Sequence, residues 1–146
     1  GHNEQRRFLM EHDFEPMQGA EAFQLSNPSI LAMAPLRASL EHFVSAGLRR
    51  VQKKSRALHR FMRSQVEARL GNAVDVLTPR GRAGAQLSLQ LRPGQPNAGE
   101  CAQALYAQRI VVDAREPDVL RLAAVPLYNR FAEVERAIRA LAGILG

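Results

Sequence analysis

The sequence predicts an α+β fold, in which a helical hairpin is followed by a small, mainly antiparallel sheet covered by helices. Between residues 28 and 70, apolar side chains recur every three or four positions, which is the spacing of an amphipathic helix. Beyond Gly71 the pattern changes to short runs in which apolar and polar residues alternate, as they do around Leu87, Leu89 and Leu91. These two patterns together indicate helices layered on one sheet.

The first helix is expected to begin at Ser26-Asn27-Pro28. A residue that precedes proline is pushed toward an extended backbone, whereas proline itself suits the first turn of a helix. Gly47 is the expected end of this helix, and Pro35 is expected to kink it. A second helix is expected from about Leu48 to Leu70, and the two helices are expected to pair as a hairpin.

The second half of the chain predicts strands and helices in a β-β-α-β-β-α order. Turn-rich segments at 78–84 and 93–99 separate the first runs. The expected strands are 73–77, 85–91, 110–113 and 119–123, and the expected helices are 100–108 and 130–145.

The length of 146 residues suits one domain with its own core. Residues 1–25 carry scattered apolar side chains without a period, and Pro16 and Gly19 interrupt them, which predicts an extended or looped lead-in. Residues 26–146 are therefore expected to form the small α+β domain.

Composition excludes several classes of function. The net charge of +6 would suit nucleic acid, but the arginines lie in almost every segment and few aromatic residues accompany them, so no nucleic-acid partner is expected. No apolar run is long enough for a membrane span, so no membrane partner is expected. The single cysteine and the absence of a secretory signal favour the cytoplasm. The four histidines lack the spacing of a metal site, so no metal is expected.

Arg121 is the first candidate for a binding residue. It lies between Leu120 and Leu122 in a predicted strand, so its side chain points away from the face that those leucines share. A guanidinium in that place can bind a carboxylate through two parallel hydrogen bonds. From the residues alone, exposure to solvent on an open sheet face is the more frequent outcome for a charged side chain.

Asn27 is the second candidate. Its side chain stands at a predicted helix start, where an amide either caps the helix or reaches outward to an anionic group such as a phosphate. Both interpretations are open at this point, because asparagine is among the best N-cap residues.

Two motifs resemble the kynureninase family. One runs from Asp113-Ala-Arg-Glu-Pro through Arg121 to Pro-Leu-Tyr-Asn129, and the other is Ser-Asn-Pro within residues 23–31. The resemblance covers nearly the whole chain, from Gly1-His2 to the final helix. It implies the C-terminal small domain of a fold-type I enzyme that depends on pyridoxal 5′-phosphate (PLP), with residues 1–25 leading in from the large domain.

The resemblance also implies an activity and its partners. The full-length enzyme would be a homodimer that hydrolyses L-kynurenine, or its 3-hydroxy form, to anthranilate, or 3-hydroxyanthranilate, and L-alanine in tryptophan breakdown. Arg121 would hold the substrate's α-carboxylate, and Asn27 would contact PLP. The resemblance suggests no clear role for Arg115, Glu116 and Tyr128, which are interpreted as structural. Arg115-Glu116-Pro117 is expected to form the turn between two strands.

The residue that would carry PLP is missing from this chain. Its only lysines, Lys53 and Lys54, are adjacent in an arginine-rich helical pattern, and neither fits a Schiff-base lysine. The chain alone is therefore expected to be inactive and to belong with its own large domain. The alternatives are a non-catalytic α+β binding module, or the small domain of another fold-type I enzyme such as an aminotransferase or a cysteine desulfurase relative.

Overall fold

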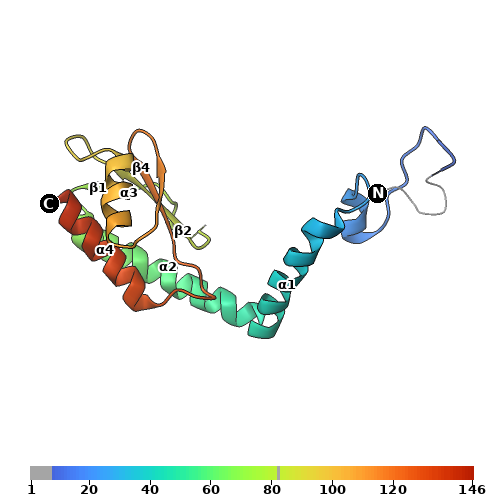
Figure 1. Cartoon of the computed structure of the whole chain (residues 1–146), viewed down its shortest axis with the longest axis horizontal. Coiled ribbons are helices and arrows are strands. Elements are labelled where there is room, and N and C mark those ends of the chain that lie inside the picture. The colour runs from blue at the N-terminus through green and yellow to red at the C-terminus, as the bar shows by residue number, and fades with distance from the viewer. Residues whose placement is uncertain (1–7, 82) are drawn as a thin grey trace. The chain divides into compact units, whose positions relative to one another are not determined.

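The computed structural model describes residues 8–81 and 83–146 (Figure 1). The chain divides into two compact units, one ending at Ser45 and the other beginning at Ala46, and each is described by itself. The expectation for Gly1-His2 lies outside the described residues.

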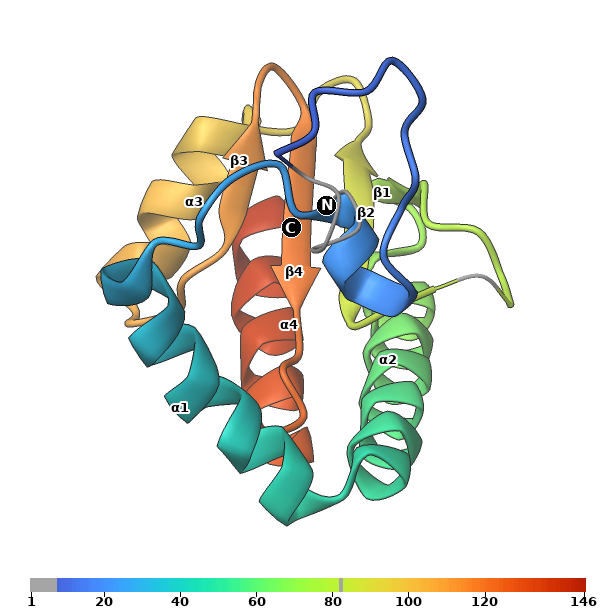
Figure 2. The same cartoon turned by 90° about the vertical axis from the view of Figure 1, so that its right-hand side faces the viewer.

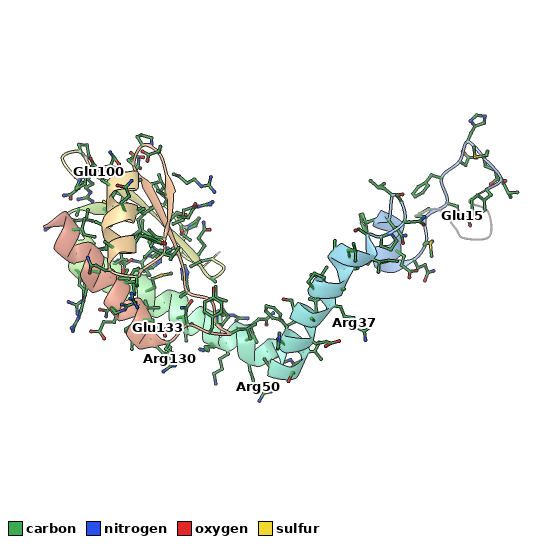
Figure 3. All side chains as sticks on the ribbon, viewed as in Figure 1. Glu15, Arg37, Arg50, Glu100, Arg130 and Glu133 are labelled. Atoms are coloured by element: carbon green, nitrogen blue, oxygen red, sulfur yellow. The ribbon has the colours of Figure 1, made fainter. Side chains whose placement is uncertain are left out.

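The first unit contains a short 3-10 helix, Gly19–Phe23, and most of helix α1, Ile30–Ala46. No residue of either helix is buried. Arg37, which Figure 3 labels on α1, forms an ion pair with Glu41 one turn later, at 3.2 Å. The helix continues through Pro35. Its apolar residues therefore have no core within this unit to pack against.

The second unit is a two-layer α+β structure. Its described residues form a four-stranded sheet in the order β1-β2-β4-β3, with every neighbouring pair antiparallel. Helices α2 and α4 run side by side under the sheet, and α3 packs against α4 and β3 (Figures 1 and 2). The elements are α2 (Leu48–Leu70), β1 (Val74–Val76), β2 (Gln86–Leu91), α3 (Ala98–Ala107), β3 (Asp113–Arg115), β4 (Val119–Ala123) and α4 (Phe131–Leu145).

The core lies between the helices and one face of the sheet. Alternate residues of the two central strands are buried there, because successive side chains of a strand point to opposite faces. Each fully buried leucine contributes roughly 1.5–3 kcal/mol through removal from water. The strands supply Leu87, Leu89, Leu91, Leu120 and Leu122, and the helices supply among others Leu58, Met62, Val66, Cys101, Leu105, Ile138 and Leu141. Among the described residues, no helix of this unit covers the opposite face of the sheet (Figure 2).

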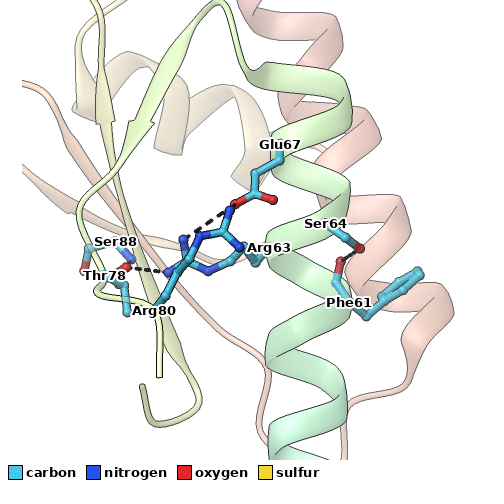
Figure 4. Close-up of polar contacts among 7 residues, drawn as sticks. All are labelled: Phe61, Arg63, Ser64, Glu67, Thr78, Arg80 and Ser88. Atoms are coloured by element: carbon cyan, nitrogen blue, oxygen red, sulfur yellow. Dashed lines mark hydrogen bonds and ion pairs between the residues drawn. The ribbon is translucent and has the colours of Figure 1, made fainter. Parts of the chain in front are cut away.

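A polar network ties α2 to the loop that follows β1. Arg63 donates to the Thr78 carbonyl, and Glu67 accepts from Arg80 at 2.6 Å (Figure 4). The Thr78 hydroxyl in turn accepts from the backbone N–H of Ser88 at 2.8 Å, which fixes the loop to β2. These bonds hold the hairpin between β1 and β2 against the helix.

The α+β fold class is confirmed, and several bounds differ from expectation. The strand expected at 110–113 is wrong for its first three residues, because β3 covers Asp113–Arg115. The amide of Ile110 instead donates to Leu105 at the end of α3, and Arg109 takes a left-handed conformation with φ 59°. The pairing of the first two helices as a hairpin spans both units and stays a prediction.

Candidate functional site

Arg121 lies in the middle of β4, as the sequence predicts. Its neighbours Leu120 and Leu122 are buried in the core, so the Arg121 side chain emerges on the opposite face of the sheet. That side chain is 32% exposed, so part of it is accessible from the open face of the sheet. Its cross-strand partners are Ser88 on β2 and Asp113 on β3.

The Asp113 carboxylate is the centre of an ionic cluster on this face. Arg121 contacts its Oδ2 atom through both Nε and Nη2, and Arg115 Nε donates to the same oxygen at 3.0 Å. The hydrogen bond from Arg121 is the largest cause that lowers the pKa of Asp113 below its usual value, and the charges of Arg115 and Arg121 add to it. The cluster therefore keeps Asp113 ionised and carries one net positive charge.

Sequence reasoning missed Asp113 and named Arg115 and Glu116 only as turn residues. The turn between β3 and β4 consists of residues 116–118, one position later than the expected Arg115-Glu116-Pro117. A three-residue connection centred on Pro117 places residue 113 opposite residue 121. The sequence could have revealed this pairing, because Asp113 and Arg121 each lie four residues from Pro117, the centre of the turn.

The Pro-Leu-Tyr-Asn segment joins β4 to α4 through the side chain of Asn129. Its Oδ1 accepts from the Val125 amide at 2.8 Å, and its Nδ2 donates to Glu133 at 3.3 Å. Glu133 also accepts from the Arg130 amide at 3.0 Å, and that bond is the main cause of its lowered pKa (Figure 3). Tyr128 is 69% exposed. The motif thus shapes the entry into α4, next to the strand that carries Arg121.

Asn27 lies in the first unit, exposed and outside any helix. Helix α1 begins at Ile30, and the Ser29 carbonyl accepts from the Met33 amide at 2.9 Å. Ser29 is therefore the N-cap residue, and the capping interpretation of Asn27 is wrong. The expected start at Pro28 is also early by two residues. Asn27 belongs to one unit and Arg121 to the other, so each is described within its own unit.

Lys53 and Lys54 lie in α2, on the helical layer of the second unit, and Lys53 is exposed. Arg121 lies on the opposite face of the sheet, so neither lysine belongs to its surroundings. Within 8–81 and 83–146, no group of three or more His, Cys, Asp and Glu side chains is arranged to hold a metal ion. None of the helices described in those ranges has the length and apolar character needed to cross a membrane.

A concave region lies beside α2. The residues that line it are Arg56, His59, Arg60, Arg63, Arg80, Gly81 and Ala83, around a volume of about 440 Å³. His59 is 8% exposed, and its Nδ1 has no hydrogen-bond partner among the described residues. Burial, followed by the charge of Arg63, lowers the pKa of His59.

Comparison with known proteins adds the family to this geometry. The model of the kynureninase C-terminal domain matches residues 51–141. A kynureninase of Xanthomonas euvesicatoria is 44% identical over 136 residues, which is 92% of this chain and 32% of that protein. A kynureninase of Stenotrophomonas maltophilia is 43% identical over 140 residues, 94% of this chain and 33% of that protein. The chain spans about a third of the length of these curated relatives.

Solved structures show the same fold at lower identity. The apo cysteine desulfurase of Thermococcus onnurineus superposes with a TM-score of 0.70 at 17% identity, over 90% of this chain and 35% of that one. A cystine C–S lyase in complex with cysteine persulfide gives a TM-score of 0.69 at 17% identity, over 88% of this chain and 33% of that one. The family match and these superpositions agree with the predicted small-domain fold, and the chain belongs to the kynureninase family, whose C-terminal domain it matches.

Proposed function

We propose that this chain is the C-terminal part of a PLP-dependent enzyme that hydrolyses the Cβ–Cγ bond of L-kynurenine, or of 3-hydroxykynurenine. The products would be anthranilate, or 3-hydroxyanthranilate, and L-alanine. Membership of the kynureninase family supports the reaction. The single observation that carries the proposal is Arg121, a partly exposed guanidinium held on the open face of the sheet.

In this proposal Arg121 binds the α-carboxylate of the substrate. A planar guanidinium binds a carboxylate through two parallel, charge-assisted hydrogen bonds, which fixes orientation as well as position. The rigid strand beneath Arg121 supports that orientation, because Leu120 and Leu122 anchor β4 in the core. Correct placement of the reacting bond lowers the barrier by removing orientational freedom before the reaction.

The residues of this chain fit PLP only in part. The Asn27 amide is exposed and has no recorded hydrogen bond among the described residues, so it is available to an anionic or polar group of the cofactor. The positions of Lys53 and Lys54 do not fit covalent attachment of PLP. The lysine that forms the Schiff base with PLP would therefore lie in the large domain. When bound, PLP supplies the electron sink for the carbanionic steps, and the protein supplies orientation and electrostatics.

The proposal also names the partners of the domain. The curated relatives are about three times as long as this chain, which supports a large domain of the same protein as the first partner. The second partner is another copy of the same protein in a homodimer, in which Asn27 would reach the PLP of that copy. We place the enzyme in the cytoplasm, where Cys101, a buried free thiol, would stay reduced.

The test compares the full-length protein with the 146-residue chain. The full-length protein is expected to show a visible PLP absorbance band and to convert L-kynurenine to anthranilate and L-alanine. The isolated chain is expected to show neither, since no lysine fits the cofactor. A full-length protein that binds PLP but hydrolyses neither L-kynurenine nor 3-hydroxykynurenine would contradict the proposed reaction. Turnover by the isolated chain would contradict the proposal that the PLP lysine lies in the large domain.

A further inference from the structure

We propose that Asp113 is a positioning residue for substrate binding: it holds the Arg121 guanidinium by one edge and leaves the Nη1 side to the substrate carboxylate. This inference rests on the proposed role of Arg121. It adds a residue to that role, and it states which part of the guanidinium the substrate uses.

The contacts of Asp113 define the edge. Both contacts from Arg121, through Nε and Nη2, converge on the single oxygen Oδ2. A guanidinium has five N–H donors in a fixed fork, so a side-on partner at Nε and Nη2 leaves both hydrogens of Nη1 and the second hydrogen of Nη2. Nη1 forms no hydrogen bond or ion pair with any residue in 8–81 or 83–146. A second carboxylate can therefore bind end-on at Nη1 and Nη2 while Asp113 stays in place.

The backbone fixes this arrangement. Asp113 and Arg121 are direct partners in the register of β3 and β4, so their side chains share one face of the sheet at neighbouring positions. The aspartate side chain is short, and Arg115 binds the same oxygen from two residues along β3, at 3.0 Å. Asp113 is thus a counter-ion bound by two arginines, and Arg121 is the long side chain whose orientation it selects.

Asp113 has two opposing effects on substrate binding, one through the orientation of Arg121 and one through its own charge. Holding the guanidinium in one orientation reduces the rotamer freedom that Arg121 loses on binding, which tightens binding. The negative charge of Asp113 repels the substrate carboxylate, which weakens binding. The lowered pKa of Asp113 keeps that charge present at neutral pH. If the positioning effect is the larger, loss of the Asp113 carboxylate weakens substrate binding. If the charge repulsion is the larger, loss of the Asp113 carboxylate strengthens substrate binding.

The experiment measures steady-state kinetics of the full-length enzyme with L-kynurenine. Asp113→Asn is expected to raise KM about tenfold, equivalent to about 1.4 kcal/mol, with kcat within about threefold of wild type. Asp113→Glu keeps the charge and is expected to recover part of the lost affinity. A competitive inhibitor that differs from L-kynurenine only in lacking the α-carboxylate serves as a control ligand. Its inhibition constant is expected to stay unchanged in both variants, because this amine has no carboxylate for Arg121 to bind.

Asp75→Asn is the matched control. Asp75 is also a sheet carboxylate held by one arginine, with Arg92 Nε and Nη2 at 3.1 and 2.6 Å, and this bond lowers its pKa. It lies on β1, which β2 separates from the strand that carries Arg121, and its ion pair is with Arg92. Its substitution is expected to leave KM and kcat at wild-type values.

The outcomes separate this inference from the proposed function. If Arg121→Ala raises KM but Asp113→Asn leaves it unchanged or lowers it, the positioning role is overturned while the role of Arg121 stands. If Arg121→Ala itself leaves KM unchanged, the proposed function fails. If neither Asp113→Asn nor Asp113→Glu folds, as judged by circular dichroism, Asp113 acts on the fold, and the inference is likewise overturned.

Discussion

At the scale of single residues, the sequence predicted where Arg121 lies but not what holds it. Alternation of Leu120 and Leu122 with Arg121 is a local signal, and it placed the guanidinium on the open face. The pairing of Arg121 with Asp113 depends on the register of two strands, which a turn misplaced by one residue changes. For Asn27, local preference suggested a cap, whereas the helix begins too late for that role.

His59 makes a prediction about pH at this scale. Its pKa in the folded chain is lowered from the ordinary 6.5 by burial, so the unfolded chain takes up a proton more readily. Protonation therefore favours unfolding, and the His59 contribution to stability, complete above pH 6.5, is lost as pH falls from there through the lowered folded pKa. Urea unfolding of the chain at pH 7.5 and 5.5 is expected to show lower stability at pH 5.5.

His59→Leu isolates this contribution. The variant removes the titrating ring and the unpartnered Nδ1, so it is expected to lose less stability than wild type between pH 7.5 and 5.5. His42→Leu, at an exposed position on α1, is the control and is expected to follow wild type. An equal loss of stability in His59→Leu and wild type would show that His59 does not titrate with unfolding.

At the scale of elements, prediction was best where one pattern ran uninterrupted. The bounds of α2 and β4 agree with expectation, because a long amphipathic period and a clean alternation leave little choice. The Ile110-Val-Val run has strand propensity, yet its first amide closes the end of α3, and pairing begins only at Asp113. The segment could either extend β3 or close the end of α3, and its local sequence does not show which of the two occurs.

Helix α3 offers a direct test at this scale. It begins two residues before the expected Glu100 because Asn97 forms a capping box. The side-chain oxygen of Asn97 accepts from the Glu100 amide at 2.8 Å, and the Glu100 carboxylate accepts from the Asn97 amide at 3.0 Å. Asn97→Ala is expected to lower the free energy of unfolding by about 1 kcal/mol, measured by urea denaturation.

Asn97→Ser retains an oxygen that can cap the helix and serves as the control. It is expected to stay close to wild type, since serine ranks with asparagine at this position. Equal destabilisation by alanine and serine would mean that the capping bond does not stabilise α3.

At the scale of the whole molecule, the two units differ in how they bury apolar surface. The second unit packs its leucines between the sheet and the helices, whereas the first leaves large apolar side chains exposed, among them Phe23, Leu25, Ile30 and Leu31. Large apolar side chains left exposed in one segment are typical of a region that another part of a protein covers. This exposure agrees with a chain that spans about a third of the length of its curated relatives.

Substrate kinetics of Arg121→Ala in the full-length protein tests the central claim most directly. We expect the variant to keep its PLP absorbance band, because Arg121 lies on the sheet face and not in the core. We expect kcat/KM for L-kynurenine to fall by at least about a hundredfold, the size of effect that follows the loss of a charge-assisted bidentate contact. A variant with wild-type kcat/KM and an intact PLP band would show that the substrate carboxylate binds elsewhere.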